Sequence, residues 1–94
     1  MSKVVEGAVA ALDAKAKGFD GTAKFVIEGE GSVYIDASGA RAADDEAEVT
    51  LTASRDTFEG LLSGDVSPTV AFMTGKLRVD GSMATAMKLG ALLS

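Results

Sequence analysis

The apolar residues of the chain follow a helical period at its start. Between residues 3 and 17 they recur every three or four positions, which predicts an amphipathic helix. Gly18 is placed to end this helix, because glycine tolerates the left-handed conformation that commonly follows a helix. The predicted apolar face consists of Val5, Val9, Leu12 and Ala16.

From residue 22 to residue 53 the pattern changes to an alternation of apolar and polar side chains, which predicts strands. The predicted strands cover 22–28, 32–37, 41–43 and 47–53. Gly29-Glu30-Gly31 lies between the first two and predicts a tight hairpin. Because each strand has one apolar face, we expect an antiparallel sheet that is covered on one side.

The helical period returns after Ser54, a residue type that favours a helix N-cap. Phe58, Leu61 and Leu62 then share one face of the predicted helix. Gly64 follows and is suited to end it. We therefore expect a short helix that covers the apolar face of the sheet.

Two further helices with one strand between them are predicted for the rest of the chain. Ser67 favours an N-cap, and Pro68 suits the first position of a helix that ends near Gly75. A strand is predicted over 76–80, and a last helix begins at 81–82. Strands that come first and helices that come later are typical of an α+β domain, with the helices gathered on one face of the sheet.

The last helix has apolar residues on two sides. At about 100° per residue, one side carries Met83, Met87, Gly90 and Ala91, and the other carries Leu89, Leu92 and Leu93. A surface helix normally has a single apolar stripe, so this helix needs two apolar neighbours. One is the sheet, and the other is a bound lipid, a partner subunit or the remaining helices. Methionine adapts to variable shapes, but at helical spacing it is more often part of a core.

Composition excludes several kinds of chemistry. The 94 residues are enough for one domain, 1–94, and contain neither cysteine nor histidine. Disulfides, thiolate metal sites and histidine-activated nucleophiles are therefore excluded. The nine basic residues are spread along a chain of net charge −5, which argues against nucleic-acid binding. We expect no cofactor.

Two sets of polar residues are candidates for catalysis or metal binding. Asp44, Asp45, Glu46 and Glu48 do not have the spacing of a calcium loop, so a solvated turn is the better interpretation. Ser54, Ser67 and Ser82 are better explained as helix caps. Because no Ser-x-x-Lys pair is present among these serines, the sequence predicts no enzymatic activity.

The sequence also predicts a cytoplasmic protein. No apolar run approaches the length of a membrane span, and Glu6 comes too early for a secretory signal. The end of the chain, 92–94, is not a peroxisomal address. We expect no stable membrane insertion, and the acidic balance weakens binding to anionic membranes unless apolar contact drives it.

The second half of the chain resembles the lipid-transfer domain of the sterol carrier protein type 2 family. The resemblance covers about half the chain, Ala47–Leu93, and fits more loosely the upstream hairpin that contains VYID. It rests on an ordered series of segments: VTLTAS, FEGLLSG, SP, AFMTGKLRV, GSM and AMKL. The order of these segments is far more specific than any one of them.

The resemblance implies a five-stranded, mainly antiparallel sheet with helices on one face and an apolar tunnel between them. Such a tunnel accepts sterols, fatty acids, fatty acyl-CoA or phospholipids. The lining that it implies is Val49, Leu51, Phe58, Leu61, Leu62, Phe72, Met73, Leu77, Met83, Met87 and Leu89. The chain is short for the family, so we expect a shallow or open tunnel.

The sequence therefore predicts a non-catalytic domain that binds lipids in an apolar cavity. Such a domain either only binds the lipid or also carries it. The alternative is a protein-interaction or accessory module in lipid or quinone metabolism. In that case the same apolar helix face would bind a partner or a second copy of the chain.

Overall fold

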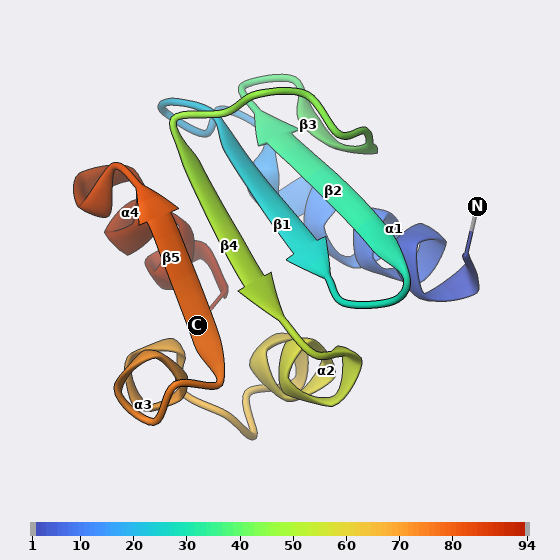
Figure 1. Cartoon of the computed structure of the whole chain (residues 1–94). Coiled ribbons are helices and arrows are strands. Elements are labelled where there is room, and N and C mark those ends of the chain that lie inside the picture. Colours follow the sequence, from blue (N-terminus) through green and yellow to red (C-terminus); the bar gives the residue numbers. More distant parts are fainter. Residues whose placement is uncertain (1, 94) are drawn as a thin grey trace.

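The five strands of the protein form one sheet in the order β3-β2-β1-β4-β5 (Figure 1). The computed structural model describes residues 2–93. The strands are β1 (Ala23–Ile27), β2 (Gly31–Asp36), β3 (Gly39–Ala42), β4 (Val49–Ala53) and β5 (Leu77–Gly81). Neighbouring strands are antiparallel except for the central pair, β1 and β4, which is parallel. The mainly antiparallel five-stranded sheet is thus confirmed, with one parallel pair at its centre.

Four helices accompany the sheet. They are α1 (Lys3–Ala16), α2 (Arg55–Ser63), α3 (Pro68–Met73) and α4 (Met83–Leu93). In Figure 1, α1 and α4 lie behind the sheet, and α2 and α3 lie at its lower end. None of the helices within residues 2–93 combines the length and the hydropathy that crossing a bilayer requires.

The helix α1 covers the β2–β3 half of the sheet. Its buried face consists of Val5, Ala8, Leu12 and Ala16. The sequence prediction placed Val9 on this face, but Val9 is only half-buried, at the edge of the core. The reason is the 3.6-residue turn, which places Ala8 rather than Val9 above the strands beside Val5 and Leu12.

The helix α2 is attached to the middle of the sheet by two aromatic rings. Phe58 and Phe25 of β1 meet edge to face, with their ring centroids 4.5 Å apart. Both side chains are almost fully buried, as is Leu61 one turn later. The predicted caps of this helix are confirmed, because Ser54 Oγ accepts from the Thr57 N–H and Gly64 adopts the left-handed conformation.

The predicted cap at Ser67 is wrong in one respect. Its side chain makes no capping hydrogen bond to α3. Its backbone is extended, the conformation that a following proline imposes, and Pro68 occupies the first turn. The start of α3 is therefore set by Pro68. At its end, the Thr74 hydroxyl donates a hydrogen bond to the Val70 carbonyl.

The sheet face opposite the helices is polar. Cζ of Arg41 on β3 lies 4.6 Å from the centroid of the Tyr34 ring on β2. Nζ of Lys24 on β1 lies 2.9 Å from Asp44 Oδ1. Since Tyr34 is opposite both Arg41 and Lys24 in the register, these side chains form one row across the sheet. The apolar core is thus confined to the helix-covered face.

Candidate functional site

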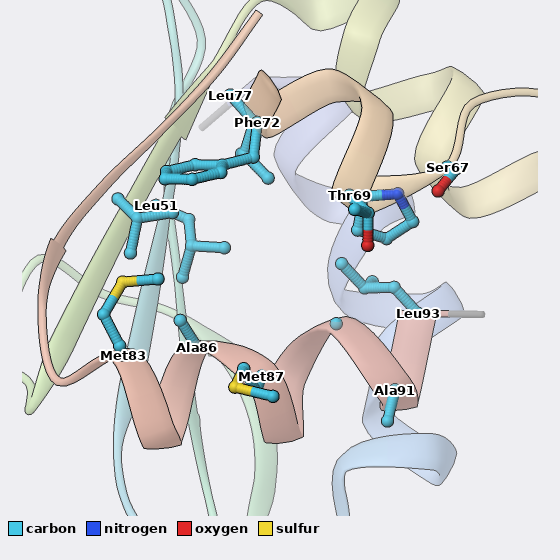
Figure 2. Close-up of a pocket in the computed structure, with 13 residues that line it drawn as sticks. Leu51, Ser67, Thr69, Phe72, Leu77, Met83, Ala86, Met87, Ala91 and Leu93 are labelled. Atoms are coloured by element: carbon cyan, nitrogen blue, oxygen red, sulfur yellow. The ribbon is translucent and has the colours of Figure 1, made fainter. Parts of the chain in front are cut away.

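A pocket of about 300 Å³ lies between α3, α4 and the β4–β5 end of the sheet. Leu51, Leu77 and Val79 form its floor on the sheet. Figure 2 shows Phe72 of α3 and Met83 of α4 on opposite sides of the pocket, with Leu51 between them in this view. The remaining lining comes from Ser67, Pro68, Thr69, Ala86, Met87, Gly90, Ala91 and Leu93.

The lining offers few polar atoms to a ligand. Its side-chain polar groups are the hydroxyls of Ser67 and Thr69, and no charged residue takes part. Apolar pockets with a few polar groups are typical of small-molecule sites. The side chains of this wall are thus suited to contact with an apolar molecule, and none of them is a carboxylate, amine or imidazole.

The pocket is open to solvent along one rim. Phe72, Met83 and Met87 keep 45%, 51% and 72% of their surface exposed although they line the pocket. Methionine side chains have several rotatable bonds, so this rim can adjust to the shape of what enters. The expected shallow or open cavity agrees with this geometry.

The helix α4 has two apolar sides, as its sequence predicts. Leu89 is buried in the core away from the pocket, Leu93 is buried in the core and also borders the pocket, and Met83 and Met87 face the pocket. Ala86 lies between these sides, almost fully buried and still part of the pocket lining. One wall of the pocket is therefore also a part of the hydrophobic core.

Two hydrogen bonds hold the start of α4 against Glu48, the residue before β4, and a third caps the helix. The Ser82 N–H donates to the Glu48 carbonyl over 2.9 Å, and the Thr85 N–H donates to Ser82 Oγ over 3.2 Å. The Thr85 hydroxyl donates to Glu48 Oε1 over 3.1 Å. The cap predicted at Ser82 is confirmed, and these bonds set the position of the α4 wall.

Five of the eleven lining residues that the family resemblance implies border the pocket. They are Leu51, Phe72, Leu77, Met83 and Met87. Val49, Phe58, Leu61 and Leu89 are instead buried in the core. Met73 lies on α3 with 77% of its surface exposed, and Leu62 lines a second pocket together with Phe58.

Sequence reasoning left several small residues out of the lining. Ala86, Gly90 and Ala91 of α4 border the pocket. Gly90 and Ala91 share a side of the helix with Met83 and Met87, so the helical period alone was enough to find them. Their small size creates the space, which a search for large apolar side chains overlooks.

The second pocket, also about 300 Å³, lies between α1 and α2. Val4 and Ala8 of α1 face Phe58 and Leu62 of α2 across it. Charged groups stand at its edge, namely Lys3 and the pair of Arg55 with Glu59, whose Nε–Oε1 distance is 3.1 Å. This ion pair raises the pKa of Arg55 above its usual value, because the guanidinium donates to the Glu59 carboxylate.

The acidic residues at positions 44–46 and 48 do not form one site. Asp44 pairs with Lys24 on the helix-free face, whereas Glu48 accepts from Thr85 near α4. Within residues 2–93, no three acidic side chains lie close enough together to hold a metal ion.

Comparison with known proteins identifies the family. The model of the SCP-2 sterol transfer family matches residues 3–94. The chain belongs to this family. Among relatives of known sequence, hydroxysteroid dehydrogenase-like protein 2 from Bos taurus is 46% identical over 50 residues, which are 53% of this chain and 12% of that protein. Peroxisomal multifunctional enzyme A from Dictyostelium discoideum is 35% identical over 65 residues, which are 69% of this chain and 14% of that protein.

Solved structures share the fold of this SCP-2 family member. The sterol carrier protein domain 2 of Helicoverpa armigera is 28% identical, with a TM-score of 0.66 over 81% of this chain and 68% of that chain. The sterol carrier protein 2 of Aedes aegypti, solved in complex with palmitate, is 21% identical, with a TM-score of 0.79. That match covers 100% of this chain and 97% of the mosquito protein. The five-stranded sheet with its helices is therefore the SCP-2 fold.

Proposed function

We propose that this chain binds a lipid with a slender apolar chain, such as a fatty acid or fatty acyl group, in the pocket between α3 and α4. The observation that carries the proposal is the lining, which is apolar apart from two hydroxyl groups and opens between Phe72 and the two methionines of α4. Membership of the SCP-2 sterol transfer family and the palmitate bound by the mosquito relative support this class of ligand.

The size of the pocket favours a chain over a bulky ring system. Its volume of about 300 Å³ is at the lower end of the range of ligand sites. Each methylene group buried there contributes about 0.8 kcal/mol, so several methylenes are enough for useful affinity without a hydrogen bond. We expect part of a long acyl chain to be buried and the polar end to lie at the open rim.

The residues that we propose to contact the ligand are those that border the pocket. Leu51 and Leu77 would lie beneath the chain, Phe72 beside it, and Met83 and Met87 at the opening. Val49, Phe58, Leu61 and Leu89 would act indirectly, because they form the core against which these walls pack.

We propose that this binding is not coupled to catalysis by the chain itself. The pocket presents no carboxylate, amine or imidazole to a bound lipid. General acid–base and nucleophilic catalysis both need such groups within hydrogen-bond reach of the reacting atoms. The chain spans only a small part of its enzyme-named relatives, and the matched part would serve there to bind lipid.

Filling the pocket tests the proposal. Ala86→Phe places a large ring in the space that Ala86 now borders, whereas Ala84→Phe adds the same ring to an exposed position of α4 outside the lining. We expect the first variant to bind a fluorescent fatty acid at least about tenfold more weakly, and the second to bind like the wild type. Thermal unfolding by circular dichroism checks that both variants are folded. Unchanged binding by folded Ala86→Phe would contradict the proposed site.

The exposure of the two methionines of α4 favours one other function. Met83 and Met87 form an apolar surface that a partner protein or a second copy could cover. Light scattering distinguishes this function from lipid binding. A dimer that Met87→Glu dissociates would support it, and a monomer at high concentration would count against it.

A further inference from the structure

The pocket between α3 and α4 has a polar end and an apolar end. Ser67 and Thr69 lie at the start of α3, and their hydroxyls are the polar side-chain groups of the lining. Figure 2 shows them on the side of the pocket away from Leu51 and Met83. One end therefore offers hydrogen bonds to a ligand, and the other offers apolar surface only.

The polar end is where α3 and α4 come close to each other. A Cβ atom added at Gly90 would lie 3.8 Å from Cβ of Pro68. Ala91 and Leu93, which follow on α4, border the pocket at this end (Figure 2). A ligand group held between the two helices here would lie beside the start of α3.

Neither of the two hydroxyls is used by the protein itself. Ser67 makes no capping bond, and Thr69 makes no side-chain hydrogen bond within residues 2–93. By contrast, Ser54 caps α2, and the Thr74 hydroxyl donates to the Val70 carbonyl. A hydroxyl without a protein partner can serve a ligand as both donor and acceptor.

Charged groups are missing from the lining. Among the described residues, none that borders the pocket is charged, and Lys76 and Lys88 both lie outside it. Lys88 Nζ is instead 2.9 Å from Asp20 Oδ2. An ionised head group that leaves water for this pocket therefore gains no counter-ion, and burying an unpaired charge costs far more than burying a hydrogen-bonded hydroxyl.

We propose that the pocket prefers slender lipids with an uncharged hydroxyl head, such as fatty alcohols, over ionised fatty acids. Ser67 and Thr69 hold the head, and the chain runs toward Leu51 and Met83. An alcohol can donate to one of the two hydroxyls and accept from the other, whereas a carboxylate can only accept. This inference rests on the proposed function and narrows its class of ligand.

Two probes of equal chain length, decanol and decanoate, test the preference. Each is used to displace a fluorescent fatty acid from the full chain at neutral pH. We expect decanol to bind at least about fivefold more tightly than decanoate. Because any apolar pocket favours the less polar of the two probes, variants must show whether the two hydroxyls and the missing cation are the cause.

Removing one hydroxyl tests its contact with the head. Thr69→Val keeps nearly the same shape, and we expect it to weaken decanol binding about fivefold, the effect of one hydrogen bond. Thr50→Val is the matched control, because Thr50 lies on the helix-free face and does not border the pocket. Thermal unfolding checks that both variants are folded. Unchanged decanol binding by folded Thr69→Val would overturn the proposal.

Adding a cation tests the role of charge. Ser67→Lys places an ammonium group at the polar end, whereas Ala84→Lys adds the same charge at an exposed position of α4 outside the lining. We expect Ser67→Lys to strengthen decanoate binding at least about fivefold and Ala84→Lys to change it little. Equal gains in both variants would show an effect of net charge alone and would overturn the proposal.

The direction of the bound chain can be measured by NMR. We expect intermolecular NOEs from the terminal methyl group of decanol to Leu51 and Met83, and from its hydroxyl-bearing carbon to Thr69. The reverse set of contacts would overturn the inference.

The two probes also separate this inference from the proposed function. If neither decanol nor decanoate displaces the fluorescent fatty acid, both fail. If the two bind equally well to the wild type, lipid binding stands and only the preference for an uncharged head is wrong.

Discussion

Thr85 Oγ1 donates a hydrogen bond to Glu48 Oε1 over 3.1 Å, although the two residues are 37 positions apart. Thr85 is 4% exposed, and within residues 2–93 it is the only polar residue that is buried. The bond joins the first turn of α4 to the residue that precedes β4. The wall of the pocket formed by α4 is thus tied to the sheet by a partly buried polar contact, since Thr85 is buried and Glu48 is exposed.

Replacing Thr85 tests the strength of this contact. Thr85→Val keeps the shape and removes the hydroxyl, and we expect the free energy of unfolding to fall by about 1 kcal/mol. Urea denaturation measures the loss. Thr50→Val is the control, because Thr50 is half-buried on the helix-free face and makes no side-chain hydrogen bond within residues 2–93. Equal effects of the two substitutions would contradict a special role for Thr85.

The aromatic contact between α2 and the sheet predicts a larger effect. Phe58 is 1% exposed and touches Phe25, so Phe58→Ala removes a core ring and leaves a cavity. We expect a loss of about 3–5 kcal/mol in the free energy of unfolding. Met73→Ala, at a position that is 77% exposed, is expected to change it by less than about 0.5 kcal/mol. Chemical denaturation of both variants makes the comparison, and a small loss in Phe58→Ala would mean that the core around α2 rearranges easily.

Substitution of two glycines distinguishes the free-energy cost of a left-handed backbone from the cost of a steric clash of the added Cβ atom. Gly75 and Gly81 have φ angles of +78° and +110°. A Cβ atom at Gly75 would meet nothing nearby, whereas one at Gly81 would collide with the backbone oxygen of Glu48. We expect Gly75→Ala to cost about 1–2 kcal/mol and Gly81→Ala clearly more. Thermal unfolding of both variants measures the difference, and an equal cost would contradict the close packing of β5 against β4.

The ion pair on β2 and β3 predicts a dependence on pH. Arg41 Nη1 lies 2.9 Å from Asp36 Oδ2, and together with the Ser38 N–H it holds the pKa of Asp36 below the usual value of 3.8. A lowered carboxyl pKa stabilises the fold above the unfolded-state value, and this contribution is lost as the pH falls through the folded-state pKa. The stability advantage of the wild type over Asp36→Asn should therefore be present at neutral pH and disappear in acid.

A carboxyl titration followed by NMR measures the pKa of Asp36 directly. In Arg41→Gln we expect this pKa to rise toward 3.8, because the largest cause of the shift is removed. An unchanged pKa in Arg41→Gln would show that the Ser38 N–H alone determines it.

Local patterns were sufficient to predict most elements of this fold. Alternation predicted the strands, and the helical period and the residues at 54, 64 and 68 predicted the helices to within about two residues. The parallel pairing of β1 with β4 was beyond such patterns. The direction of β4 relative to β1 depends on the path that the chain takes between β3 and β4. The alternation cannot reveal this direction, because a strand has the same apolar face whichever way it runs.

What the sequence determined by itself is the set of elements, their apolar faces and membership of a lipid-binding family. These follow from local periods, turn residues and an ordered series of motifs. Only the tertiary structure decided which apolar residues face a pocket and which face one another, since Leu89 and Met87 are neighbours on one helix but lie in different surroundings. It also decided which charges meet, since Lys88 Nζ lies 2.9 Å from Asp20 Oδ2 although the two residues are 68 positions apart.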